Sequence, residues 1–307
     1  MIFTNMETKD SNDIFVFELP SSIRSYVKVV GVGHYGSTIV SIMSMVGLLG
    51  VDFAIVENNP IPMKCRMIDD NNIVDSNDPE CEKKVREIVG RDTTMLFIVS
   101  GLEDDYCEPI ITSMCHLVHS YEEDNDDIVS LALIAPSRGE KEKKSIDTIA
   151  QEATKVITFY RDNTHHNLLP NLDEDEQQII DVIQTICQLF LNHQYCCVDY
   201  SDVATVLHLG NNAVYGVGKG GGGMRAEKAI RELIHDFKSK GCKMANVKGL
   251  LLYIRFSPTH QPTVAEYNFL IDMIYHLKGN ECELIYNASD DIQFEDDTIV
   301  LNAIAVY

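Results

Sequence analysis

The stretch Val27-Lys-Val-Val-Gly-Val-Gly-His-Tyr-Gly-Ser37 joins a β-branched run to three spaced glycines, Gly31, Gly33 and Gly36. A strand, a glycine loop and a helix in this order bring a phosphate to the helix N-terminus, because glycine lets the backbone approach a ligand closely. Glu57 ends the next β-branched run, near the position expected for a ribose-binding acid. The stretch therefore predicts a phosphate site, and dinucleotide binding is one interpretation of it.

Apolar runs and helical stretches alternate through the first half of the chain. The runs that predict buried strands are Val27–Gly33, Val51–Glu57, Thr94–Ser100, Ile128–Ala135 and Lys155–Tyr160, and the helical stretches between them are Ser37–Leu49, Cys81–Val89, Cys107–Ser120 and Lys141–Ala153. Such alternation predicts a doubly wound parallel sheet with right-handed crossovers. Residues 1–25 are polar and acidic apart from Ile14–Leu19, and we interpret them as an extension.

The second half of the chain has a different pattern. Residues 173–193 have apolar positions at helical spacing, which predicts a long connecting helix. The pattern beyond it is mixed, with expected strands Ala213–Val217, Gly249–Phe256, Glu281–Ala288 and Thr298–Val306 and expected helices Met224–Lys238 and Val264–His276. We therefore expect an α/β fold with a Rossmann-like nucleotide-binding-type domain (26–172), a long central helix (173–193) and a smaller α+β C-terminal domain (194–307).

The charge balance excludes several classes of partner. The chain has 25 Lys and Arg against 47 Asp and Glu, a formal net charge of −22. This charge repels nucleic-acid phosphates and anionic lipids, so we expect no nucleic-acid binding and membrane contact only through a partner. The N-terminus lacks the features of a signal peptide, and no apolar run approaches the ~18 residues of a membrane span. Nine scattered cysteines without a CxxC pair suit a reducing cytoplasm.

Two further motifs have ordinary structural interpretations. The glycine-rich stretch 216–223 lacks the hydroxyl residue of a phosphate loop after Lys219, which favours a flexible connection with Arg225 and Lys228 on an exposed helix face. Asp199 and Asp202, three residues apart, either cap a helix start or polarise a water molecule. The residues alone favour the capping role.

The ordered motifs together resemble the tubulin and FtsZ superfamily over nearly the whole chain after Tyr26. The segments that carry the resemblance are Val27–Ser37 (first nucleotide loop), Met95–Gly101 (strand before the phosphate loop), Leu131–Lys144 (ribose loop), Val198–Leu207 (synergy loop), and Gly216–Ile230 with Val247–Phe256 (C-terminal domain). The resemblance implies that GTP binds the first domain and that the synergy loop of the next subunit completes the site. It makes Asp199 and Asp202 the catalytic carboxylates acting on a neighbouring subunit, with Cys197 where the family has Asn.

The phosphate loop departs from the family pattern. Where the family has glycines and threonines, this chain has Gly101-Leu-Glu103-Asp104-Asp105-Tyr-Cys-Glu108. Carboxylates in place of amide donors repel phosphate, and at ~5 Å each repulsion costs several times the thermal energy at an effective dielectric near 20. The resemblance therefore implies a degenerate GTPase with a vestigial nucleotide site.

Other positions of the vestigial site are altered as well. His34 and Tyr35 replace two glycines ahead of Gly36 and Ser37. Glu140 and Lys144 fall where the ribose-binding Glu and a phosphate-side Arg are expected. Gln177 and Arg161 stand where the family has base-contacting residues. The sequence ends at Tyr307 without the linker and terminal peptide through which FtsZ meets membrane tethers, so we do not assume those partners.

Three functional hypotheses follow. The first is a non-hydrolysing cytoskeletal protein of cell division or membrane remodelling, which forms, caps or co-assembles with filaments by head-to-tail contact with itself or another FtsZ/tubulin-like subunit. The alternative is a divergent GTPase in which Glu103, Asp104 and Asp105 hold Mg²⁺ and recover phosphate binding through the ion. GTP and Mg²⁺ are cofactors only under this alternative. A dinucleotide binder ranks last, because it leaves the second domain unexplained.

Overall fold

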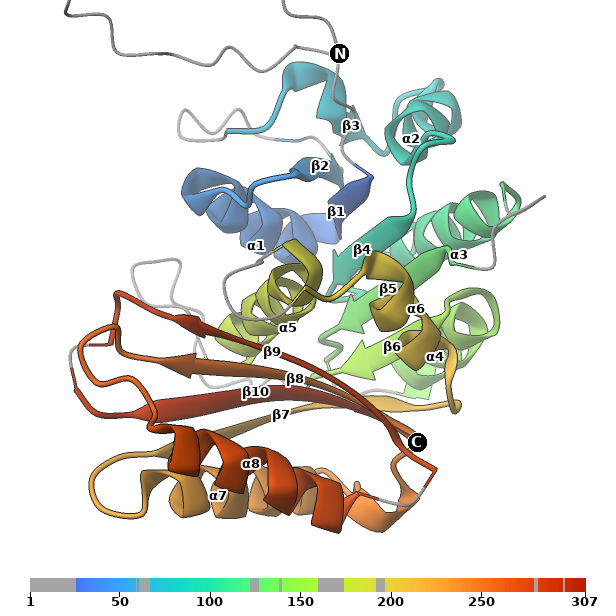
Figure 1. The fold of residues 1–307 in the computed structure, drawn as a ribbon. Coiled ribbons are helices and arrows are strands. Elements are labelled where there is room, and N and C mark those ends of the chain that lie inside the picture. Colours follow the sequence, from blue (N-terminus) through green and yellow to red (C-terminus); the bar gives the residue numbers. More distant parts are fainter. Residues whose placement is uncertain are drawn as a thin grey trace, which may run out of the picture.

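Two β-sheets and the helices that cover them form the molecule (Figure 1). The computed structural model describes residues 26–58, 60, 67–121, 127–137, 140–159, 174–191, 197–278, 281–294 and 296–307. The N-terminal extension 1–25 and Arg161 lie outside the described residues. None of the helices in the described ranges is long and apolar enough to cross a membrane.

The first sheet is parallel and six-stranded, in the order β3-β2-β1-β4-β5-β6. Its strands are β1 (Val27–Val32), β2 (Val51–Glu57), β3 (Ile73–Asp75), β4 (Met95–Ser100), β5 (Val129–Ile134) and β6 (Lys155–Thr158). The helices between them are α1 (Gly33–Val46), α2 (Cys81–Val89), α3 (Cys107–His119) and α4 (Glu140–Glu152). Every residue of β4 and β5 is buried, as expected for parallel strands covered on both faces.

The second sheet has the order β7-β10-β8-β9, with β10 antiparallel to both neighbours and β8 parallel to β9. Its strands are β7 (Ala213–Gly220), β8 (Gly249–Phe256), β9 (Glu283–Asp290) and β10 (Ile299–Val306). The helices of this half are α5 (Glu174–Leu191), α6 (Tyr200–His208), α7 (Arg225–Ser239) and α8 (Val264–Leu277).

Three apolar clusters order these elements into layers. Helices α2, α3 and α4 cover one face of the first sheet, and α1 covers the other. Helix α5 packs in the same cluster as α1 and also contacts the inner face of the second sheet, so it lies between the two sheets. Helices α7 and α8 cover the outer face of the second sheet (Figure 1). The parallel sheet, long central helix and second mixed sheet confirm the predicted fold class.

The structure corrects several sequence-based expectations. Helix α1 begins at Gly33, four residues before the expected Ser37, and β3 has no counterpart among the expected elements. The helix start considered at Asp199 and Asp202 is that of α6. The stretch expected to be a flexible connection forms the second half of β7 as far as Gly220. Arg225, expected on an exposed face, is buried, whereas Lys228 is exposed.

The glycines of β7 are explained by close packing against α7. A Cβ atom on Gly216 would lie 2.6 Å from the Phe237 ring, and one on Gly218 would lie 2.1 Å from the Ala229 carbonyl oxygen. Both contacts are too short for a side chain unless the neighbouring atoms shift, and at Gly218 the neighbour is the backbone of α7. The glycines therefore let helix and strand approach each other, and their role is not flexibility.

Gly218→Ala is expected to lower the free energy of unfolding by about 1–3 kcal/mol, because the added methyl group overlaps the backbone of α7. Urea denaturation followed by circular dichroism measures the change. The matched control is Gly223→Ala, where nothing lies within 4 Å of the new Cβ atom. Equal losses in the two variants would contradict the packing explanation.

Candidate functional site

The sequence motifs converge at the carboxyl ends of β1 and β4, where the strand order changes direction. In open α/β sheets, ligands bind in the crevice at this switch point. Gly33 opens α1 on one side, and Gly101 follows β4 on the other. A Cβ atom on Gly36 would lie 2.0 Å from the carbonyl oxygen of Val99, so this glycine lets α1 pack closely against β4.

The side chain of Glu103 reaches into the first turn of α1. Its Oε1 accepts a hydrogen bond of 2.6 Å from the backbone N–H of Tyr35. A Cβ atom on Gly33 would lie 2.8 Å from the same oxygen. The first N–H groups of a helix carry partial positive charge and form an anion site. A carboxylate of the chain itself therefore occupies the place where this helix would bind a phosphate.

The rest of the acidic loop is tied to α4. Asp105 forms an ion pair with Lys141, and the hydrogen bond from Lys141 holds the pKa of Asp105 below its ordinary value. Ser145 donates a hydrogen bond to Glu108. Sequence reasoning had selected Glu140 and Lys144 on this helix; both are exposed, and Lys141 is the cation that meets the loop. The only sequence signal for Lys141 is its place in the lysine-rich stretch 141–144, which does not indicate which lysine pairs with the acidic loop.

The acidic loop does not form a cluster suited to a metal ion. Among the residues that the structure describes, no three His, Cys, Asp or Glu side chains are grouped as metal ligands would be. Glu103 faces α1, and Asp105 faces α4. The proposed Mg²⁺ ligands Glu103, Asp104 and Asp105 thus gain no geometric support.

The opposite wall of the crevice is formed by the end of β2. Glu57 Oε1 lies 2.8 Å from His34 Nδ1, so the predicted ribose-binding acid contacts a side chain of α1. The backbone N–H of Asn58 donates to the hydroxyl of Tyr106 at 3.1 Å, and burial raises the pKa of Tyr106. The polar groups at the end of β2 are therefore engaged by other residues of the chain itself.

Ser37 and Gln177 are two other predicted nucleotide contacts, and they lie on different helices, α1 and α5. Ser37 is buried, and its hydroxyl has no hydrogen-bond partner among the described residues. Gln177 donates to Asp181 Oδ1 at 2.8 Å along α5. Arg161 cannot be placed, since it lies outside the described residues.

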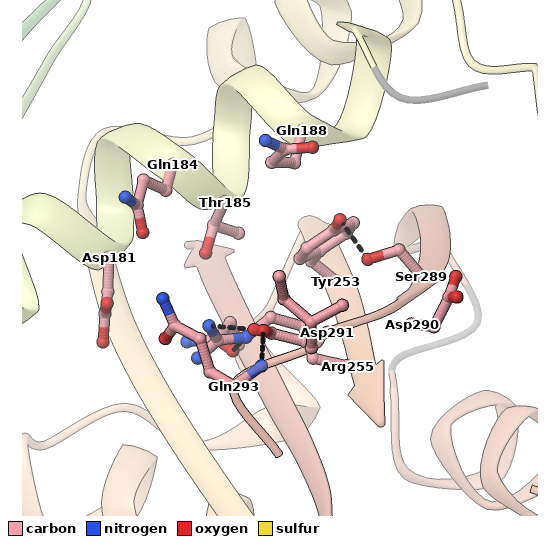
Figure 2. Close-up of a pocket in the computed structure, with 12 residues that line it drawn as sticks. Asp181, Gln184, Thr185, Gln188, Tyr253, Arg255, Ser289, Asp290, Asp291 and Gln293 are labelled. Carbon is pink, nitrogen blue, oxygen red and sulfur yellow. Dashed lines mark hydrogen bonds and ion pairs between the residues drawn. The ribbon is translucent and has the colours of Figure 1, made fainter. Parts of the chain in front are cut away.

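Asp181 lines a polar cavity of about 280 Å³ between α5 and the second sheet (Figure 2). Arg255 of β8 projects into it and forms an ion pair of 3.2 Å with Asp291. Burial raises the pKa of Asp181. This cavity lies apart from the crevice at β1 and β4, and the phosphate motifs do not line it.

Asp199 and Asp202 lie at the start of α6, and both are exposed. The backbone N–H of Asp199 points to Asp202 Oδ2 at 3.4 Å, as in a capping box. The hydroxyl oxygen of Tyr200 lies 2.7 Å from the carbonyl oxygen of Thr94 and 2.6 Å from that of Asp127. The α6 start is therefore held at the amino ends of β4 and β5.

The two halves of the predicted site thus lie at opposite ends of the first sheet. Strand β4 separates them, and its six residues span roughly 20 Å at ~3.3 Å per residue. One chain cannot bring Asp199 and Asp202 to its own crevice. A second subunit would have to supply one half.

Known proteins resemble this chain in sequence and in structure, although no protein-family model matches it. The cell division protein FtsZ of Aquifex aeolicus (strain VF5) is 22% identical over 303 residues, 88% of this chain and 80% of that protein. An FtsZ structure from M. jannaschii superposes with a TM-score of 0.74 at 15% identity, covering 92% of this chain and 90% of that one. The chain has the tubulin/FtsZ fold.

Other structures with the tubulin/FtsZ fold are also similar to this chain. A GTPγS-bound protofilament of CetZ2 from Haloferax volcanii has a TM-score of 0.62 at 14% identity, covering 91% of this chain and 93% of that one. GDP-form protofilaments of TubZ from Bacillus thuringiensis serovar israelensis have a TM-score of 0.61 at 13% identity, covering 92% and 83%. Both of these relatives were captured in an assembled state.

Proposed function

We propose that this chain is an FtsZ/tubulin-like cytoskeletal protein of the cytoplasm that does not hydrolyse GTP and that caps or co-assembles with filaments. One observation carries the proposal, the Glu103 carboxylate bound to the Tyr35 N–H at the start of α1. A phosphate would have to displace this carboxylate. It would also meet the charge of Asp104 next to it.

The charges at the two ends of the first sheet support a capping role. The crevice end carries Glu103, Asp104 and Asp105, and the opposite end carries Asp199 and Asp202. Head-to-tail contact between two copies would place these carboxylates against each other, and like charges across an interface disfavour association. Another FtsZ-like subunit that holds nucleotide and Mg²⁺ lacks the acidic loop of this chain. Its nucleotide end therefore does not repel Asp199 and Asp202 in the same way. Addition to the end of its filament is therefore favoured over growth by self-assembly.

Removing the two charges from the α6 start is expected to weaken the effect on a filament strongly. The assay measures the polymer mass of a GTP-hydrolysing FtsZ by sedimentation, with this chain added at substoichiometric amounts. Asp199→Asn with Asp202→Asn should need at least about tenfold more protein for the same effect, since charge pairs across interfaces are commonly worth more than 1.4 kcal/mol. Asn caps helices as well as Asp does, so the fold of α6 is retained.

The matched control is Ser201→Ala, which changes an exposed side chain between the two carboxylates without altering charge. It should act like the unmodified chain. If the Asp199→Asn, Asp202→Asn variant were as effective as the unmodified chain, the proposal that the α6 end joins the filament would be contradicted. Phosphate release by the chain alone in Mg²⁺ would instead favour a divergent GTPase.

A further inference from the structure

An exposed apolar surface lies where α1 and α5 end. Val46 and Leu49 are 78% and 88% exposed, and Met45 and Leu191 are 49% and 40% exposed. We refer to these four side chains as the α1–α5 patch. Single exposed apolar residues are ordinary on a protein surface, but a contiguous group of large ones marks an interaction site.

The backbone fixes this patch in place. Gly47 and Gly50 have φ values of +73° and +77°, a conformation that suits glycine, and they bound the turn that presents Leu49. A Cβ atom on Gly50 would lie 3.9 Å from Leu191 Cδ2, so the turn adjoins the end of α5. Helices α1 and α5 lie next to each other in Figure 1. The turn and the end of α5 therefore adjoin, and the four exposed side chains lie at the ends of these neighbouring elements.

The N-terminal segment joins the described chain beside this patch. Val27 is the register partner of Val51, two residues after Leu49. Neighbouring strands are ~4.8 Å apart, so Tyr26 lies close to the turn. The apolar run of the segment is Asp13-Ile-Phe-Val-Phe-Glu-Leu19, and the seven Cα–Cα steps from Leu19 to Tyr26 span at most ~25 Å. The patch is within reach of the run.

We propose that Ile14–Leu19 binds the α1–α5 patch of its own chain. In an extended peptide alternate side chains share a face, so Phe15, Phe17 and Leu19 together offer one apolar surface to the patch. Attachment at Tyr26 makes the contact intramolecular and raises the effective concentration of the run at the patch. A second copy of the chain that bound through its own patch would not gain this effective concentration.

The bound segment would regulate the end of the molecule that carries Asp199. Phe190 and Tyr200 are in edge-to-face contact, with ring centroids 5.5 Å apart, which places Leu191 near the start of α6. A segment on the patch thus lies beside Asp199 and Asp202 and competes with a filament for this end. Only this consequence rests on the proposed function; the binding itself does not.

The absence of tryptophan from the sequence allows a direct test. Leu49→Trp places a single reporter in the patch of the full chain, and acrylamide quenching of its emission measures exposure to solvent. Deleting residues 2–20, or introducing Phe15→Ser with Phe17→Ser, should raise the quenching constant at least about twofold, since contact with apolar side chains excludes water. Ile292→Trp is the matched control: Ile292 is also 88% exposed, and its quenching should not respond to either change.

The proposal predicts that quenching of Leu49→Trp is independent of protein concentration. Equal quenching with and without the segment would overturn it. Shielding that appears only with dimers in sedimentation, and that persists after the Phe15→Ser, Phe17→Ser change, would also overturn it in favour of a second copy. Neither result depends on GTP or on a partner filament, so a failure here is distinguishable from a failure of the proposed function.

Discussion

Glu103→Gly is expected to raise the affinity of the chain for GTP at least about tenfold, which corresponds to about 1.4 kcal/mol. The substitution removes the carboxylate that accepts the Tyr35 N–H and frees the start of α1 for an anion. It also lowers the negative charge beside the crevice, and one charge repulsion at close range exceeds the required energy. Calorimetric titration with GTP measures the change.

Glu108→Gln is the charge-matched control for Glu103→Gly. Glu108 belongs to the same acidic stretch, but its carboxylate accepts a hydrogen bond from Ser145 on α4 and not from α1. Removing its charge should alter the affinity for GTP much less than Glu103→Gly does. Equal gains for both variants would mean that the net charge of the loop matters and that the position of Glu103 at the helix does not.

Arg225→Ala is expected to lower the free energy of unfolding by about 1.5–3 kcal/mol, because the Arg225 side chain is only 9% exposed and makes charge-assisted hydrogen bonds to Glu266, whose side chain is 29% exposed. The guanidinium donates from Nε to Glu266 Oε1 at 2.8 Å and from Nη2 to Glu266 Oε2 at 3.1 Å. It also donates to the carbonyl oxygens of His260, Gln261 and Asp297. Its removal takes the guanidinium donor from each of these acceptors and breaks a polar link between α7 and the start of α8. Glu266 then keeps its hydrogen bonds from Thr263.

The control for Arg225→Ala is Arg231→Ala on the same helix. Arg231 pairs with Glu227 on the surface, its side chain is 76% exposed, and such i,i+4 pairs contribute about 0.3–0.5 kcal/mol. Chemical denaturation of both variants gives the comparison. A loss after Arg225→Ala no greater than after Arg231→Ala would show that the Arg225–Glu266 pair does not stabilise this half of the molecule.

The Arg225 pair also predicts a dependence of stability on pH. The hydrogen bond from Arg225 lowers the pKa of Glu266 from 4.5 to about 2 in the folded chain. A carboxyl group with a lowered folded pKa contributes stability that is present above its ordinary pKa and is lost as the pH falls through the folded value. The difference in stability between the unmodified chain and Arg225→Ala should therefore shrink between about pH 5 and pH 2.

The sequence was sufficient to predict the fold because periodicity and buried runs determine which elements form. The runs at Val51–Glu57 and Gly249–Phe256 and the helix Cys81–Val89 have the predicted bounds. The glycines of β7 were misjudged because composition does not distinguish a glycine that bends the chain from one that admits a neighbouring helix. Only the contact of Gly218 with α7 distinguishes the two cases.

The candidate site was predictable as a set of residues but not as a set of contacts. Sequence reasoning placed the acidic loop after β4 and expected repulsion of phosphate. It could not predict that Glu103 turns into α1 whereas Asp105 turns to Lys141, because side-chain direction depends on which element packs beside the loop. For the same reason Arg225 appeared to be a surface residue, since its partner Glu266 lies 41 residues away in the sequence.

The central claim is that the carboxylate at the start of α1 excludes nucleotide. Calorimetric titration of the purified chain with GTP tests it most directly, first in Mg²⁺ and then in EDTA, after removal of any nucleotide that co-purifies. The account predicts no saturable binding up to about 1 mM GTP in either condition, which limits the binding free energy to about −4 kcal/mol or weaker. Binding in the micromolar range that requires Mg²⁺ would contradict it.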